Sequence, residues 1–514
     1  MTRRDHGSQR PIPPPSEVWI PITLGIILRS IQVWMPITGI HSWRQADTAA
    51  MARHFHLSNT PIWLPQIDWG GASAGYVESE FPLFPYLTSQ LYQLFGLHEW
   101  LGRCLSIVCS ALTIWLIIRL GRRWFNPAAG WWGGMALAVA PLGIYYGRSF
   151  QAEALMLLCA AAALESHSFW SSQQSKRGLI LSWLLFTTAA LIKVIPLLWL
   201  GLPLLLVQLT PDPQNRAEPL RSTAHRLVNL LRRPGFWIYS GSSIAIVSAW
   251  YFHAYQLGDA SGLSFGFWGE DSDRSNIGLI LNLSSWLNLT LRTGIRVLSV
   301  IGIPFLIFGG IRSWPTGGGR IALGGLIGVL LCTLATMQSS TVHEYYQLPM
   351  LLFTSPLIGL GLDSWQKRGQ GRLIWWFLGL WLMISMLVMS IDYWAVEVRQ
   401  SRAWMPLART IRNELPSDAR IVTVTGPDPT LLNLARRQGW MISSSNVTPA
   451  RIERLRRAGA SHLAGSFLWE ATYQAMPQAD RETLRRIASS SDDGWIDENN
   501  QTYLLPLNKI AGDF

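Results

Sequence analysis

Long apolar runs recur along most of this chain and predict a bundle of membrane-spanning helices. A helix that crosses a bilayer needs roughly 20 predominantly apolar residues. Runs of about that length lie at 18–37, 100–118, 128–146, 150–170, 178–195, 196–210 (short), 236–256, 293–311, 321–338, 348–362 and 373–391. The pattern predicts about eleven transmembrane helices. The first run has no small-residue cleavage site and is followed by further spans, so we expect it to remain as an anchor.

The pattern of apolar positions changes after residue 391. The stretches "ARIVTVTG" and "QTYLLPL" are typical of strands, and "PTLLNLARRQG" and "PARIERLRRAG" are typical of amphipathic helices closed by Gly439 and Gly459. We therefore divide the chain into a Pro-rich basic tail (1–17), a membrane bundle (18–391) and a small α/β domain (392–514). The expected fold is a mainly α, polytopic membrane protein with a small C-terminal α/β domain.

Composition and charge support this division and give it an orientation. The sequence is 49% hydrophobic and only 14% charged, which is typical of membrane proteins. With the N-terminus inside, the inner segments hold eighteen Lys and Arg and the outer ones six, as the positive-inside rule expects. An odd number of spans then places 392–514 outside. The net charge of +11 is mostly this topology signal, so we expect contact with membrane lipid and no nucleic-acid partner.

The first outer loop, 38–99, is far longer than a usual connection between packed elements, and such loops are commonly functional. It opens with "HSWRQADTAAMARHF". In a helix, Arg44, Asp47 and His54 would share one face, whereas Arg53 would point elsewhere. Ionisable groups at the edge of a bilayer are costly, and they are usually retained for work on a substrate or an ion.

Three more ionisable clusters are expected at the same outer depth. They are Glu78 and Glu80 in "GYVESEFPLFPYL", Arg148 and Glu153 in "YYGRSFQAEALML", and His343, Glu344, Tyr345 and Tyr346 in "TVHEYYQLP". Outer cations are disfavoured by the positive-inside rule, so an anionic ligand such as a lipid phosphate would account for Arg44, Arg53, Arg148, Lys193 and His343. The carboxylates of Asp47, Glu80 and Glu153 would serve proton transfer, sugar hydroxyls or a metal.

Several of these motifs, taken in order, resemble those of a known family. The motifs are "RQADTA", "SEFPLFPYL", "SFQAEAL", "LIKVIP" and "HEYYQLP". Their order and their shared side of the membrane are similar to the integral-membrane GT-C glycosyltransferases. The closest branch is bacterial family 39, related to protein O-mannosyltransferases and aminoarabinose transferases. The resemblance covers most of 18–391.

The resemblance implies a transferase at the outer face of the bacterial cytoplasmic membrane. It would move a sugar with inversion from a polyprenyl-phosphate donor to a hydroxyl of a glycan, lipid or protein acceptor. Asp47 matches the catalytic acid and would act as general base, and Glu80 matches the second acid, near the sugar or a metal. The lipid phosphate and sugar would meet the remaining site residues, which are Arg44, Arg148, Glu153, His343, Tyr345 and Tyr346.

The match to this family has two departures and leaves the cofactor open. Many relatives have Glu where this chain has Thr48, and some have Lys where it has Phe81. The resemblance requires no cofactor. It leaves room for a divalent metal, for which Glu80 and His343 would be the candidate ligands.

Two other classes of function share parts of this pattern. A secondary transporter also buries ionisable groups, but it usually shows inverted repeats and central charges, whereas here the charges gather at one edge. A lipid-linked glycan polymerase or ligase would share the donor, but would more naturally carry its main outer loop late in the bundle. The transferase is therefore the main hypothesis. Within it, the outer domain would either roof the site and help to choose the acceptor or serve as a stabilising cap.

Overall fold

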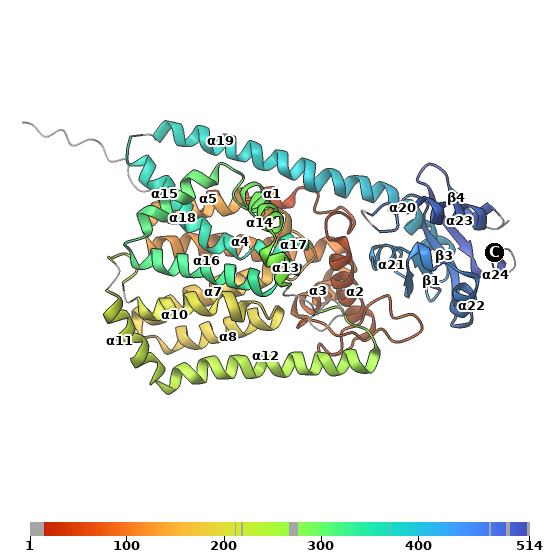
Figure 1. Ribbon diagram of the computed structural model, residues 1–514, viewed down its shortest axis with the longest axis horizontal. Coiled ribbons are helices and arrows are strands. Elements are labelled where there is room, and N and C mark those ends of the chain that lie inside the picture. Colours follow the sequence, from red (N-terminus) through yellow and green to blue (C-terminus); the bar gives the residue numbers. More distant parts are fainter. Residues whose placement is uncertain are drawn as a thin grey trace, which may run out of the picture.

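The computed structural model describes residues 15–210, 212–216, 219–266, 276–369, 371–471, 474–489 and 494–510. Most of the expected tail, 1–14, lies outside the described residues. A helical bundle forms one end of the molecule, and a small sheet with its own helices forms the other (Figure 1). The predicted class, a mainly α protein with a small C-terminal sheet, is confirmed.

Most of the longer helices of the bundle overlap the predicted apolar runs, whereas α11, α13 and α14 lie between them. Their bounds are α1 (Trp19–Ser30), α4 (Glu99–Trp124), α5 (Pro127–Val139), α6 (Pro141–Tyr146), α7 (Glu153–Gln173), α8 (Lys176–Ile192), α9 (Pro196–Trp199), α10 (Gly201–Leu209), α11 (Leu220–Leu231), α12 (Pro234–Ser261), α13 (Ile277–Leu281), α14 (Leu283–Arg292), η2 (Thr293–Val297), α15 (Gly302–Ser313), α16 (Gly317–Ala335), α17 (Met337–Val342), η3 (Glu344–Gln347), α18 (Met350–Gln366), α19 (Gly371–Val388) and η4 (Met389–Trp394).

Within the part of the chain that the structure describes, length and composition alone identify three helices that could cross a membrane, at Glu99–Trp124, Gly317–Ala335 and Leu373–Glu414. A fourth is added if Leu283–Val297 and Gly302–Ser313, which meet at 97°, count as one broken span. The other predicted spans fall on helices that are shorter, interrupted or less apolar. Their crossing of the membrane stays a prediction.

Two of the interruptions have local causes. The first apolar run is helical only to Ser30, since Gln32 lies in the left-handed region with φ 59°. The run at 128–146 is divided into α5 and α6 because Pro141 has no amide hydrogen to continue the helix. Both interruptions lie near the outer end of the bundle, where the ionisable residues gather.

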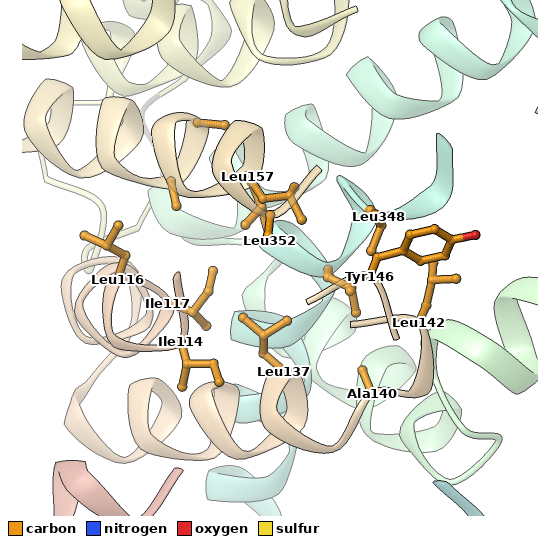
Figure 2. Packing of buried hydrophobic residues seen from close by; sticks show 14 of the residues in the cluster. Ile114, Leu116, Ile117, Leu137, Ala140, Leu142, Tyr146, Leu157, Leu348 and Leu352 are labelled. Atoms are coloured by element: carbon orange, nitrogen blue, oxygen red, sulfur yellow. The ribbon is translucent and has the colours of Figure 1, made fainter. Parts of the chain in front are cut away.

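The bundle core packs through apolar side chains and close helix contacts. Leu137 of α5, Leu157 of α7 and Leu352 of α18 lie near one another in its middle (Figure 2). Glycines allow α5 and α18 to touch through their backbones, since a Cβ added at Gly359 would lie 2.0 Å from the carbonyl oxygen of Ala129.

The C-terminal domain is a five-stranded mixed sheet with strand order β2-β1-β3-β5-β4. Strand β1 pairs in parallel with β2 and β3, and β5 pairs antiparallel with β3 and β4. The bounds are α20 (Ala395–Glu414), β1 (Arg420–Val424), α21 (Thr430–Ala435), β2 (Gly439–Ile442), η5 (Ser444–Asn446), α22 (Pro449–Arg457), β3 (Ala460–Ser466), α23 (Gln478–Ser489), β4 (Trp495–Asp497), β5 (Thr502–Pro506) and α24 (Leu507–Ile510).

One expectation for this domain is wrong. Helix α21 ends at Ala435 with Arg436 in the left-handed region, so Gly439 does not close it. Gly439 instead begins β2, where an added Cβ would lie 1.8 Å from the carbonyl oxygen of Ile421. Only glycine allows the two strands to approach this closely. Gly459, with φ 97°, follows α22 as expected.

Helix α20 continues α19 out of the bundle toward the C-terminal domain (Figure 1). Near its start, the buried carboxylate of Glu397 lies between two buried guanidinium groups, 3.1 Å from Arg103 Nη2 and 2.5 Å from Arg148 Nη2. Thr38 donates a hydrogen bond to the carbonyl oxygen of Glu397, at 3.0 Å, so the same turn of helix also holds the start of the outer loop.

Replacing Glu397 with Gln should destabilise the whole protein. The change leaves two buried guanidinium groups without their carboxylate, and breaking a buried ion pair costs about 3–5 kcal/mol. Thermal melting in detergent measures the loss. Glu414→Gln, an exposed change at the far end of α20, is the matched control and should melt like the wild type. Equal melting of the two variants would contradict the structural role of Glu397.

Candidate active site

Helix α2 (Ser42–Ser58) places the first group of predicted site residues. It begins after His41, whose φ of 51° turns the chain from the end of the first apolar run into the outer loop. The small side chains of Ala46, Ala49 and Ala52 are buried, which allows the helix to lie flat against its neighbours. Helix α2 can therefore carry Arg44 and Asp47 in a buried position, one turn apart.

Arg44 enters a buried ionic cluster with residues from three other segments. It forms an ion pair with Glu80, and its Nε lies 3.8 Å from Glu153 Oε1. Lys193 Nζ lies 2.6 Å from the same oxygen of Glu153. We call these four residues the Arg44–Lys193 cluster. It holds two cations and two carboxylates, and it joins α2, the later part of the outer loop, the start of α7 and the residue after α8.

Aromatic side chains of the "HEYYQLP" segment cover this cluster. Lys193 Nζ lies 4.4 Å from the ring centre of Tyr345 and 5.6 Å from that of Tyr346, and Arg44 lies 5.6 Å from the Tyr345 ring. The ring of His343 stacks on Tyr345 with centres 5.3 Å apart and planes 6° apart. The structure thus brings Arg44, Glu80, Glu153 and these three rings together.

The protonation of this group differs in one respect from the expectation. Burial, together with nearby His41 and Arg44, lowers the pKa of His343 to about 2. His343 is therefore neutral at physiological pH and does not supply the positive charge expected of it. Burial alone would lower the pKa of Arg44, but Glu80 and Tyr345 raise it above its usual value. The positive charge facing the rings comes from Arg44 and Lys193.

Asp47 lies one turn from Arg44 on α2 but takes no part in an ion pair among the described residues. It is 2% exposed. Trp69 Nε1 donates a hydrogen bond to Asp47 Oδ1 at 3.0 Å. Burial raises the pKa of Asp47 well above its usual value, and the charges of Asp68 and Asp428 raise it further. A carboxylate without a cation and with a raised pKa is a stronger base than an ordinary aspartate.

Arg53 and His54 belong to a separate group on the same helix. Both contact Asp68, with His54 Nε2 2.9 Å from Asp68 Oδ1, and Arg53 Nη1 donates to Asn433 Oδ1 at 2.8 Å. Burial would raise the pKa of Asp68, but Arg53 and His54 outweigh it and lower the pKa. His54 therefore does not join Arg44, and Arg53 lies outside the Arg44–Lys193 cluster, as its position on the helix predicted.

Arg148 is the predicted site residue that the structure separates most clearly from the others. Its guanidinium pairs with Glu397 and so does not face the Arg44–Lys193 cluster. The sequence did not reveal this pairing, since 249 residues separate Arg148 and Glu397. The second cation of the cluster is instead Lys193, in the motif "LIKVIP".

Glu344 is a central residue that the sequence analysis did not include among its site residues. Its carboxylate accepts hydrogen bonds from the hydroxyl groups of Tyr146, at 3.1 Å, and Tyr393, at 2.9 Å, and it pairs with Arg296. Arg296 also pairs with Asp392 at 3.0 Å. These contacts hold the segment whose next two residues, Tyr345 and Tyr346, cover the cations. Its position inside the motif "HEYYQLP" was the sequence feature that could have identified it as a site residue.

The residues around Glu80 and His343 do not fit a metal site. Among the described residues, no three His, Cys, Asp or Glu side chains come close enough together to hold a metal ion. Glu80 is paired with Arg44, and His343 is stacked on Tyr345. The chemistry of this site is therefore assigned to its side chains.

Comparisons with known proteins identify the fold that carries these residues. Residues 79–231 match the family model described as dolichyl-phosphate-mannose-protein mannosyltransferase. The structure of ArnT from Cupriavidus metallidurans bound to undecaprenyl phosphate covers 97% of this chain and 99% of its own, with a TM-score of 0.64 and 15% identity. The chain has the GT-C glycosyltransferase fold. The resemblance to family 39 that the motifs indicated is thereby confirmed.

A second similar structure aligns over part of its own length. The archaeal oligosaccharyltransferase AglB from Archaeoglobus fulgidus, in complex with an inhibitory peptide and a dolichol-phosphate, aligns with 88% of this chain and 69% of its own. The TM-score is 0.54 and the identity 11%. No curated protein matches the chain by sequence. The similarity to known structures therefore lies in the fold.

Replacing Glu344 with Gln should loosen the segment that covers the cations. The variant removes the carboxylate from two tyrosine hydroxyls and from Arg296, and loss of a buried charge partner costs about 3–5 kcal/mol. Hydrogen exchange of the peptide spanning 337–350 should accelerate, and the melting temperature should fall. Tyr393→Phe removes one hydrogen bond to the carboxylate but leaves the pair with Arg296, so it should cost less, about 1.5–3 kcal/mol. Unchanged exchange in Glu344→Gln would show that other contacts hold the segment.

Proposed function

We propose that this chain transfers a sugar from a polyprenyl-phosphate donor to an acceptor hydroxyl at the outer face of the bacterial cytoplasmic membrane. In this proposal, 18–391 form the membrane-embedded catalytic bundle with the N-terminus inside, and 392–514 form the outer domain. Asp47 acts as general base and the configuration at the sugar inverts. The fold, and the undecaprenyl phosphate and dolichol-phosphate named in the two similar structures, support a donor of this class.

The arrangement of α2 is the observation that carries the proposal. One turn of this helix places Arg44 beside Glu153 and Tyr345, which Lys193 also contacts, and the next places Asp47 as a buried carboxylate that pairs with no described cation. An anion-binding group and a base are thus held on one rigid element. Transfer from a lipid phosphate needs both, since the phosphate must be stabilised as it leaves while a hydroxyl is deprotonated.

The residues of the site divide this chemistry between them. Asp47, held by the Trp69 N–H, takes the proton of the acceptor hydroxyl while that oxygen forms its bond to the anomeric carbon of the sugar. The bond from this carbon to the phosphate oxygen breaks, and its electron pair stays on the lipid phosphate. Arg44 and Lys193 then stabilise the added negative charge, with the hydroxyl groups of Tyr345 and Tyr346 as neutral donors beside them.

The carboxylates of the Arg44–Lys193 cluster keep the cations in position before the donor arrives. Two cations buried without a counter-ion would be strongly unfavourable, and Glu80 and Glu153 neutralise them. Glu153 is 1% exposed and is paired with Lys193 at 2.6 Å, whereas Glu80 is more exposed. We infer that Glu80 is the carboxylate that turns toward the sugar when phosphate takes its place beside Arg44.

Asp47→Asn should abolish transfer without unfolding the protein. The amide keeps the shape of the side chain but cannot accept the proton. Release of undecaprenyl phosphate from a panel of undecaprenyl-phosphate sugars, with a membrane extract as acceptor, measures turnover by mass spectrometry. The wild type should release lipid phosphate from at least one sugar, and the variant from none. Normal turnover in the variant would rule out Asp47 as the base.

Asp47 also gives the activity and the stability a defined pH dependence. Its pKa is raised, so transfer should decline, as pH falls, at a pH above the usual aspartate range, because the base becomes protonated. A raised folded-state pKa favours the folded state fully below the unfolded pKa, and this advantage is lost as pH rises through the folded pKa. Asp47→Asn should therefore melt no lower than the wild type at neutral pH. A much lower melting temperature would contradict this sign.

Arg44→Gln and Lys193→Gln should each weaken binding of undecaprenyl phosphate about ten- to a hundredfold. Each removes a charge-assisted contact worth roughly 1.5–3 kcal/mol. Arg53→Gln is the matched control on α2, since Arg53 pairs with Asp68 outside the cluster, and it should retain affinity. Arg148→Gln should lower the melting temperature because Glu397 loses a partner. Loss of affinity in Arg53→Gln alone would place the phosphate on the other side of α2.

A further inference from the structure

A second concave surface lies apart from the Arg44–Lys193 cluster, between α20 and the C-terminal sheet. Its volume is about 620 Å³, within the range of about 300–1,000 Å³ that is typical of ligand pockets. One wall is a single helix face running from η4 into α20, and the other is made of two turns of the C-terminal domain. The residues that matter here are Trp394, Arg399, Arg402, Trp469, Asn499 and Asn500. We call this surface the α20 groove.

The polar groups of the α20 groove are suited to an anion. Arg399 and Arg402 are exposed, lie three residues apart on one helix face, and form no ion pair with any described residue. The side-chain amide of Asn499 also has no partner among the described residues. Asn500 Nδ2 donates a hydrogen bond to Asp497 Oδ2 at 2.6 Å, so the Asp497 carboxylate is bonded within its own turn. Two free guanidinium groups beside a free amide form a surface that favours a carboxylate or a phosphate.

Two residues that line the groove each carry a buried polar atom without a partner. Trp394 Nε1 and Gln32 Oε1 have no hydrogen-bond partner among the described residues. Gln32 also adopts a left-handed backbone with φ 59°. Unsatisfied buried groups are rare in native proteins and need an explanation. An unpaired donor and an unpaired acceptor in residues of one groove suit a ligand rich in hydroxyl groups.

Aromatic rings contribute the third element of the surface. Trp394 on the helix and Trp469 on the domain lie on opposite walls of the groove. Their flat faces can pack against the apolar face of a ligand ring while polar groups are bound at its edge. Rings, amides, cations and unsatisfied polar atoms thus occur together among the residues that line one groove.

We propose that the α20 groove binds an acidic saccharide, a sugar chain that bears carboxylate or phosphate groups, as part of the acceptor. Its role in acceptor choice rests on the proposed transferase function; its binding of the saccharide does not. The groove is connected to the site through Gln32, whose carbonyl oxygen accepts from Arg103 at 3.0 Å, and through Thr38, which bonds to the backbone of Glu397. An acceptor seated here lies beside the segment that leads directly into α2.

Calorimetric titration of the purified full chain in detergent tests the groove. The probes are a hexamer of galacturonic acid, neutral maltohexaose of equal length, and inorganic phosphate, each at physiological salt. The wild type should bind the acidic hexamer at least tenfold more tightly than either of the others. Arg399→Gln combined with Arg402→Gln should weaken this binding by tenfold or more. Removal of the same number of charges elsewhere, in Arg409→Gln with Arg451→Gln, should change it less than twofold.

Other outcomes overturn the proposal in distinct ways. Failure of the acidic hexamer to bind, or equal affinity in both double variants, would show that the groove does not recognise it. Equal binding of phosphate would reduce the groove to a plain anion site, and equal binding of maltohexaose would remove the role of charge. Undecaprenyl phosphate binding, measured on the same samples, shows that the variants are folded. Turnover by Asp47→Asn tests the transferase proposal separately, so the two can fail independently.

Discussion

The cost of burying charge governs the outer end of this molecule. An isolated ion inside a protein is strongly unfavourable, and it persists only beside a partner of opposite charge. Among the described residues, networks of this kind surround Glu153, Glu397 and Glu344. Each joins segments that are far apart in the sequence, so each fixes a loop or a helix end to the bundle. Removing a single carboxylate would release two segments at once, which explains why the networks determine the shape of the site.

Asp47 stands apart from these networks because no described cation pairs with it. Glu153, Glu344 and Glu397 are each paired with an arginine or a lysine. Asp47 instead accepts a hydrogen bond from Trp69 Nε1, and burial together with the negative charges of Asp68 and Asp428 raises its pKa. Helix α2 therefore carries a carboxylate that is suited to proton transfer. This carboxylate lies between groups whose charges are already paired. The presence or absence of a paired cation, rather than the residue type, distinguishes Asp47 from the structural acids.

The sequence predicted the helices and the motif clusters because both are local. Apolar runs set the helices, since a helix satisfies its own backbone hydrogen bonds, and Arg44, Glu80, Glu153 and the "HEYYQLP" rings do meet. Which charged residues pair with one another, in contrast, depends on contacts between segments that are distant in the sequence. Nothing near Arg148 indicates that Glu397 would pair with it, and Gly439 resembles a helix end until the neighbouring strand is known. The α20 groove was equally hidden, because its walls are brought together only by the docking of the C-terminal domain.

That docking also fixes Asp47 relative to the domain. Gly71 of the outer loop donates to the carbonyl oxygen of Gly439 at 2.8 Å, and Gly439 donates to that of Asp68 at 2.9 Å. Thr430 of α21 contacts Ser42 at the start of α2 through their hydroxyl groups, 3.0 Å apart. With Arg53 bound to Asn433, α2 is held by the C-terminal domain at both ends. A ligand bound between α20 and this domain would therefore act on the helix that carries Asp47, because the domain cannot shift without moving that helix.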